Sequence, residues 1–318
     1  MKSIGAVPEN TSELPEPRRG RVMRLVSRRS VLKSLAVPAV VAVSGSLCPE
    51  ARCQDKSGRL SKVGWCWDGQ GFNGGVDPSI FGAGEGTKWF GLTKTAYMFH
   101  PNTELALEKL RGCEQVICEI SKWKVRRCEN GVAHYLDGSI ATKGQEAAKV
   151  GRLSRSFRNI VGAIDDDLLG IIKREAITPE QYGSVYETLK KANPELKLWV
   201  VVYDGELDKK NWAGFEQFMD VVNLCVGNET ANFPKLGRYL DRCNELFPNK
   251  PVNLIYRLRD FGYQPLGPVR MDLLRQHWHD IRKYVEQGRL SGYSILGGFL
   301  IDMHPEQARW VRGFIAAN

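Results

Sequence analysis

Three consecutive aspartates, Asp165, Asp166 and Asp167, end the apolar run NIVGAIDDDLLG that begins at residue 159. Adjacent like charges repel, so each ionised carboxylate raises the pKa of its neighbours. Capping of the next helix accounts for one acid at most. Carboxyls gathered in a cleft can keep one group protonated while its neighbour stays ionised, which general acid and base catalysis requires. The run therefore predicts at least one catalytic carboxyl.

Two further acids are candidates for a second carboxylate. Glu119 alternates with apolar neighbours, which indicates a strand-end side chain that faces the axis of a barrel. Asp260 follows the apolar run at 252–258, where a helix cap or a pairing with a neighbouring arginine is an equally simple interpretation. We take Asp166 and Asp167 as the leading acid, base or nucleophile candidates, and Glu119 or Asp260 as their partner.

Eight short, β-rich apolar runs alternate with helical patterns from about Asp55 onward, the arrangement of parallel strands joined by crossover helices. Several runs are apolar nearly throughout, as strands buried on both faces must be. Eight strands with helices between them predict a (β/α)8 barrel. The runs lie at 62–68, 94–100, 115–121, 159–166, 197–203, 220–226, 252–258 and 292–298.

Several helices have readable ends. Thr178 followed by Pro179 and Gln181 predicts a capping-box start, with the helix ending before Pro194. The Gly-rich segment after the first strand shows no helical period. An incomplete or decorated barrel is therefore one alternative, and an open doubly wound sheet is another. Other helices are expected from Asn102 or Thr103 to Gly112 and at 211–219, 235–246, 271–288 and 305–316.

The active site of such a barrel lies at the carboxyl ends of the strands, and the three aspartates end the fourth. Polar and aromatic residues at the other strand ends are expected to bind the substrate. Trp67 and Tyr203 are the preferred platforms for a sugar ring, whereas Trp65, Trp123, Trp199 and Trp212 are expected in the core. The expected substrate-binding residues are Trp67, Asp68, His100, Tyr203, Asp204, Glu206, Asn228 and Arg259.

The segments VGAIDDDL, YRLRDFG and GRLSGYSILGG resemble an uncharacterised group of exported, glycosidase-like barrel proteins. The resemblance extends from about Gly162 to Trp310 and implies a barrel that acts on carbohydrate, without an assigned activity. In that group an aromatic residue follows the aspartates that match Asp166 and Asp167. This chain has Leu168 there, so the pocket beside the carboxylates differs in shape.

The N-terminal segment has the pattern of an export signal. SRRSVLK, residues 27–33, resembles the twin-arginine translocation motif, and the apolar run after it is too short to span a bilayer comfortably. We expect residues 1–46 to be a removable twin-arginine signal region, 47–61 a linker and 62–318 the barrel domain. The mature protein would be periplasmic or extracellular, without a stable membrane span. Lipidation at Cys48, an N-terminal anchoring helix and a start at Met23 are the alternatives.

The positive charge does not indicate nucleic-acid binding. The chain carries a net charge of +9, and residues 1–54 alone, with nine Lys and Arg against four Asp and Glu, contribute +5. The remaining 264 residues carry only +4 and contain no basic run interleaved with aromatics. The expected partners are therefore a glycan and the export machinery.

Cysteines and histidines give no metal-binding pattern. The eight cysteines form no C-x-x-C; those inside predicted strands, 66, 118 and 225, are expected as buried thiols, and a disulfide is possible among 113, 128 and 243. His277 and His279 lie two apart on a predicted helix, so they cannot face one ligand and are expected at the surface. Asp302 is interpreted as a helix-start acid rather than as a metal ligand with His304.

Paired carboxylates in a barrel mouth are the machinery of glycoside hydrolysis, in which one protonates the leaving oxygen and the other acts as nucleophile or base. The sequence therefore predicts an exported glycoside hydrolase that needs no cofactor. One alternative is a lyase or isomerase in which the same acids hold a divalent cation. The other is a glycan-binding barrel without catalysis.

Overall fold

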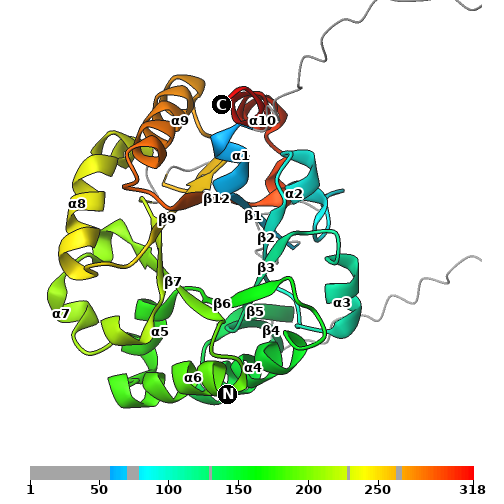
Figure 1. Cartoon of the computed structure of the whole chain (residues 1–318), viewed down its shortest axis with the longest axis vertical. Coiled ribbons are helices and arrows are strands. Elements are labelled where there is room, and N and C mark those ends of the chain that lie inside the picture. Colours follow the sequence, from blue (N-terminus) through cyan, green and yellow to red (C-terminus); the bar gives the residue numbers. More distant parts are fainter. Residues whose placement is uncertain (1–57, 70–78, 129–130, 228–229, 263–266) are drawn as a thin grey trace, which may run out of the picture. The chain divides into compact units, whose positions relative to one another are not determined.

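The computed structural model describes residues 58–69, 79–128, 131–227, 230–262 and 267–318, which form a closed eight-stranded parallel barrel ringed by helices (Figure 1). The predicted (β/α)8 fold is confirmed. The open-sheet alternative is wrong, because β1 pairs with β12 and closes the barrel. The barrel strands are β1 Gly64–Asp68, β2 Lys94–Tyr97, β3 Gln115–Glu119, β6 Ile160–Asp165, β7 Lys197–Tyr203, β8 Val221–Cys225, β9 Val252–Arg257 and β12 Gly292–Leu296.

Helices cover the outside of the barrel, and their ends follow local sequence signals. Thr178 and Gln181 form the expected capping box, and Thr103 caps its helix through the backbone N–H of Ala106. The helices are α1 Arg59–Val63, α2 Glu85–Trp89, α3 Glu104–Lys109, α4 Ile140–Leu153, α5 Leu168–Glu175, α6 Pro179–Ala192, α7 Lys209–Trp212, α8 Leu236–Leu246, α9 Met271–Glu286 and α10 Pro305–Ala317, with 3-10 turns η1 Asp204–Glu206, η2 Glu216–Phe218, η3 Thr230–Lys235 and η4 Gly298–Leu300.

Two crossovers differ from expectation. The Gly-rich segment after β1 contains the helix α2, whose five residues are too few to show a helical period in the sequence. The helix expected at 211–219 is divided into α7 and η2, because Gly214 between them has a φ of +86°, which no helical residue adopts. The first helix, α1, lies partly within the segment expected to be linker.

An antiparallel hairpin, β4 Lys122–Cys128 and β5 Gly131–Asp137, is inserted between β3 and α4. The pattern of apolar runs does not predict this hairpin. A shorter pair, β10 Arg259–Asp260 and β11 Gly267–Pro268, follows β9. Both insertions follow the carboxyl ends of barrel strands, where (β/α)8 proteins carry their active sites.

Two apolar clusters hold the barrel together. The larger lies between the strands and the helices, and the smaller fills the barrel interior around Trp65, Trp67 and Trp199. Three hydrogen-bonded polar side chains also lie in the interior. Asn253 Nδ2 donates to Asn223 Oδ1 and to Ser294 Oγ, both at 2.7 Å. Hydrogen bonding offsets the cost of burying these side chains.

One predicted histidine position needs correction, whereas the predicted burial of the strand cysteines is confirmed. The expectation that His277 is a surface residue is wrong, because it is 1% exposed and stacks on Phe233 at 3.9 Å between ring centroids. The predicted strand thiols are buried, and Cys113 and Cys243 are free in the part of the chain that is described. None of the described helices is both long enough and apolar enough to cross a membrane.

Candidate active site

The end of β6 points the three consecutive aspartates in different directions. Side chains alternate between the two faces of a strand. Ile164 belongs to the cluster inside the barrel, so Asp166, two residues further, lies on the inner side and Asp165 on the outer side. The three acids therefore occupy different surroundings despite being adjacent in the chain.

Asp165 has a structural role. It forms an ion pair with Lys143 of α4, and both side chains are 0% exposed. The Ser121 hydroxyl also donates to Asp165 Oδ1 at 2.7 Å, and Lys143 Nζ donates to Ser121 Oγ at 2.8 Å. These contacts join the end of β6 to α4 and to the residues after β3.

Asp166 is the buried acid of the barrel mouth. Its Oδ1 accepts the backbone N–H of Asp167 at 3.0 Å. Burial raises the pKa of Asp166 well above its ordinary value, and the negative charges of Asp167 and Glu119 raise it further. Asp166 therefore tends to keep its proton beside two other acids, the state required of a general acid.

Asp167 precedes α5 with a φ of +51°, an uncommon left-handed conformation for a residue other than glycine. This backbone turn separates its side chain from that of Asp166. The Tyr203 hydroxyl at the end of β7 donates to Asp167 Oδ1 at 2.7 Å. Burial and the nearby acids raise the pKa of Tyr203 well above its ordinary value, so the hydroxyl retains the proton that it donates.

Glu119 ends β3 on the inner side of the barrel. It is fully buried, and its Oε2 accepts the backbone N–H of Phe99 at 2.6 Å. Burial raises the pKa of Glu119 to about 7, although the positive charge of Lys122 opposes the shift. Its second oxygen, Oε1, is buried without a hydrogen-bond partner among the residues described, so it can accept or share a proton with a bound group.

Aromatic side chains line the wall beside Glu119. Phe99 has a φ of +69°, which aims its backbone N–H at the carboxylate. Its ring lies 6.5 Å from that of Trp123 in the hairpin and 5.7 Å from that of Phe299 in η4, measured between centroids. Trp123, expected in the core, is only partly buried. Together, Phe99, Trp123 and Phe299 form an aromatic wall.

Three residues from the first two strands have other surroundings. Trp67 lies inside the barrel, 3% exposed, and its Nε1 has no described partner. Asp68 lies on the outer face, where it accepts hydrogen bonds from Thr87 and Thr95, and burial raises its pKa to about 6. His100 stacks on Tyr97, and burial lowers its pKa. Asp68 therefore does not join the carboxylates of the barrel mouth.

The remaining candidates hold loops together. Asp260 accepts the Thr230 hydroxyl at 2.7 Å, and Arg259 Nε donates to His304 Nε2 at 3.1 Å. Asp204 accepts the side-chain amide of Asn232, and Glu206 accepts the backbone N–H of Tyr203. Asn228 lies outside the described residues. Asp302, expected to start α10, instead accepts Ser79 Oγ and the backbone N–H of Ile80.

Sequence reasoning missed Arg257 as a site residue. It lies two residues after Ile255, which belongs to the cluster inside the barrel, so the same alternation that identified Glu119 could have found it. Its guanidinium donates to the Val226 carbonyl oxygen at 3.4 Å. The guanidinium of Arg257 also lies over the ring of Phe261, 5.3 Å from its centroid, and Arg257 is only 5% exposed, so β9 ends in a buried cation.

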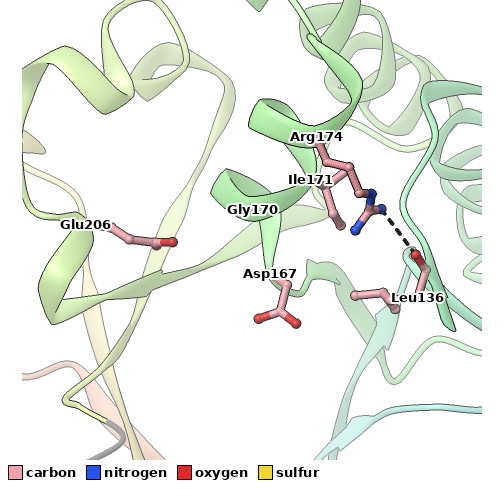
Figure 2. A pocket seen from close by; sticks show the side chains of 6 residues that line it. All are labelled: Leu136, Asp167, Gly170, Ile171, Arg174 and Glu206. Carbon is pink, nitrogen blue, oxygen red and sulfur yellow. Dashed lines mark hydrogen bonds between the residues drawn. The ribbon is translucent and has the colours of Figure 1, made fainter. Parts of the chain in front are cut away.

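A cavity of about 220 Å³ adjoins Asp167. Figure 2 shows Glu206 on one side and the hairpin residue Leu136 on the other, with Asp167 between them at the start of α5. Arg174 spans the outer side by donating to the Leu136 carbonyl oxygen at 3.3 Å. We call this cavity the α5 pocket; it is lined by Leu136, Asp167, Gly170, Ile171, Arg174 and Glu206.

Within the described ranges, no group of three or more His, Cys, Asp or Glu side chains has an arrangement that could hold a metal ion. The acids of the barrel mouth interact mainly with hydrogen-bond donors: the Phe99 and Asp167 backbone amides and the Tyr203 hydroxyl. The arrangement suits proton transfer between a buried acid and a bound group.

No protein-family model matches the chain, and no curated protein is significantly similar in sequence. Solved structures show a shared fold. An α-L-fucosidase candidate from Bacteroides thetaiotaomicron is 8% identical, with coverage of 88% of this chain and 100% of that chain and a TM-score of 0.51. The β-glucuronidase 2 of Bacteroides uniformis is 10% identical, with coverage of 74% and 30% and a TM-score of 0.50.

A GH128 endo-β-1,3-glucanase from Amycolatopsis mediterranei is 12% identical, with coverage of 82% of this chain and 100% of that chain and a TM-score of 0.49. The chain thus spans less than a third of the glucuronidase and the full length of the other two. At these identities the likeness to the fucosidase candidate and to the glucuronidase concerns the fold alone.

Proposed function

We propose that the chain is a glycoside hydrolase in which Asp166 is the general acid and Asp167 the ionised carboxylate. The observation that carries this proposal is the buried Asp166 carboxyl, whose pKa burial and two acidic neighbours hold well above its ordinary value. Glycosidic cleavage needs one carboxyl that delivers a proton and one that is already ionised. Asp166 would protonate the leaving oxygen, and Asp167 would act as nucleophile or as base on water.

Tyr203 would orient the ionised partner. Its hydroxyl donates to one oxygen of Asp167, which leaves the other oxygen for the sugar or for water. A charge-assisted hydrogen bond of this kind stabilises the carboxylate and fixes its direction. Tyr203 is thus a positioning residue, because it acts through Asp167.

Glu119 would set the proton affinity of Asp166. Its negative charge raises the pKa of Asp166, and its own pKa is about 7. As the pH rises through this value Glu119 ionises, and Asp166 then holds its proton more strongly. The two acids therefore titrate as a coupled pair. This coupling would extend the pH range over which Asp166 remains a proton donor.

The aromatic wall supports a sugar as the substrate. The partly exposed rings of Phe99 and Trp123 can give apolar contact to the C–H face of a pyranose, with the buried Phe299 behind Phe99, while nearby carboxylates accept hydrogen bonds from its hydroxyls. The shared fold with carbohydrate-active proteins agrees with this interpretation but is not its basis.

We also propose that the protein is exported through the twin-arginine pathway, on the basis of residues 27–33. These residues lie outside the described part of the chain. A glycan outside the cytoplasm is the substrate that such a location would provide.

The test is to measure turnover and binding on a panel of nitrophenyl glycosides and oligosaccharides. Asp166→Asn and Asp167→Asn should each lose about 10²–10⁴-fold in kcat while glycan binding persists. The control is Asp272→Asn, which removes an exposed acid on α9 that pairs with Arg270. Full turnover in both variants would refute the proposal. Loss of activity in chelator would instead indicate a divalent cation, and binding without turnover in any form would indicate a binding module.

A further inference from the structure

We propose that the α5 pocket binds one uncharged pyranose residue of a longer glycan, next to the bond that is cleaved. This inference rests on the proposed function and adds a substrate class, a neutral oligosaccharide. Its physical basis is a cavity that shares Asp167 with the candidate active site and is otherwise lined by residues that the proposed reaction does not use.

The position of the pocket connects it to the reaction. Asp167 lines the pocket, and its Oδ1 is held by the Tyr203 hydroxyl. Glu206 also lines the pocket and accepts the backbone N–H of Tyr203 at 3.0 Å. Tyr203 therefore fixes both acids, one through its side chain and one through its backbone. A glycan held at Asp167 therefore has this cavity beside it.

The lining matches a sugar in size and polarity. The volume of about 220 Å³ is smaller than the roughly 300–1,000 Å³ of sites for drug-sized ligands, which limits the occupant to a small group such as one sugar ring. Ile171 and Leu136 provide apolar surface, and the carboxylates of Asp167 and Glu206 can accept hydrogen bonds from hydroxyl groups (Figure 2). This pairing of apolar surface with a few fixed acceptors is typical of sites for small polar ligands.

The charges around the pocket select against an acidic sugar. The carboxylates of Asp167, Glu206 and the adjoining Glu175 outnumber the two cations beside them, Arg174 and Lys173, whose charge acts on Glu206. Arg174 is already engaged by Glu175 at 2.9 Å and by the Leu136 carbonyl oxygen at 3.3 Å. A uronic acid would bring another carboxylate into this cavity, and like charges at close range are unfavourable. A neutral hydroxyl-bearing ring avoids that repulsion.

Gly170 provides a way to fill the pocket. It lies on α5 at the cavity, and a Cβ built there meets no atom within 4 Å. Gly170→Leu should therefore place a side chain in open space without disturbing the core. Leucine also has a higher helix propensity than glycine, so the change does not weaken α5. The matched control is Gly144→Leu on α4, where a Cβ likewise meets no atom within 4 Å.

The experiment measures kcat/KM for the native protein, Gly170→Leu and Gly144→Leu. The neutral substrates are maltohexaose, cellohexaose, laminarihexaose and nitrophenyl monoglycosides of the same sugars. The acidic substrate is hexagalacturonate. We expect Gly170→Leu to reduce the ratio of kcat/KM for the hexasaccharide to that for the monoglycoside by about tenfold or more. Gly144→Leu should leave the ratio unchanged, and thermal unfolding should show all three proteins folded.

The outcomes separate the two proposals. An unchanged ratio in Gly170→Leu, with the native protein active, would overturn the subsite and leave the hydrolase proposal intact. Preference of the native protein for hexagalacturonate would overturn the neutral class of ligand. A native protein that neither binds nor cleaves any member of the panel would overturn the hydrolase proposal and the subsite with it.

Discussion

Replacement of Lys143 should destabilise the fold, although this side chain contacts none of the proposed reacting groups. Lys143 and Asp165 are both 0% exposed, and once the ammonium is gone Asp165 keeps neutral hydroxyls beside it, those of Ser121 and Tyr182, but no cation that pairs with it. An unpaired buried charge left by loss of its partner costs about 3–5 kcal/mol. Methionine has nearly the length of lysine, so Lys143→Met adds little cavity cost. We expect a loss of about 4 kcal/mol.

Urea denaturation and thermal unfolding would measure this loss. For a domain of this size, each kcal/mol corresponds to about 2 °C in Tm, so the Tm should fall by roughly 8 °C. Lys143→Met combined with Asp165→Leu should recover most of the stability, because it removes both charges from the interior. Arg282→Met, which breaks an exposed ion pair with Glu286, should cost at most about 0.5 kcal/mol.

Two results would contradict this role of the buried ion pair. A loss below about 1 kcal/mol in Lys143→Met would show that the buried pair does not stabilise the end of β6. A double variant no more stable than the single one would show that the cost arises from packing of the side chain rather than from unpaired charge.

Three other predictions follow from the site and the N-terminal motif. Burial raises the pKa of Glu119 from 4.5 to about 7, so the native protein should lose roughly 3 kcal/mol of stability as the pH rises across that window. Denaturation curves at about pH 4 and pH 8 should show this loss in the native protein but not in Glu119→Gln. An equal pH dependence of stability in both proteins would contradict the burial argument. Tyr203→Phe should fold normally but lower kcat by about tenfold, because Asp167 loses its hydroxyl donor. An unaltered kcat would show that Tyr203 does not contribute to the reaction. Replacement of Arg28 and Arg29 together by lysine should leave precursor in the cytoplasm on a fractionation blot, whereas normal export would exclude the twin-arginine assignment.

The strands were predictable because each is a local pattern. All eight expected runs contain a barrel strand, since burial on both faces requires a continuous apolar run. Closure of the barrel depends on contacts between the first and last strands, such as Gly64 with Tyr293, and no local pattern reports them. It could be inferred only from the number and alternation of elements.

The inner acids were more accessible to prediction than their partners. Alternation along β3 indicated that Glu119 faces the axis, and the structure places it there. The pairing of Asp165 with Lys143 depends on how α4 packs against β6, which the sequence does not show. Asp68 follows the inward Trp67, so alternation could have placed it on the outer face.

The hairpin and the buried histidine show two limits of pattern recognition. The β4 segment KWKVRRC is too basic to form an apolar run, so a search for buried strands passes over it. His277 shares a helix face with Leu274 and Ile281, three residues before it and four after it, and both are buried. That spacing was the available signal for burial, and it outweighs the polarity of the imidazole.

Because side chains alternate along β6, the number of residues in this strand determines which acid faces the barrel interior. Loss of one residue between Gly162 and Asp165 would turn every later side chain to the opposite face. The acid that now pairs with Lys143 would then enter the barrel, and Asp166 would face the helices. Such a deletion would exchange a structural acid for the proposed catalytic one while leaving the composition of the acidic run unchanged. Related chains that share this site should therefore vary in length in the loops around β6, not within it.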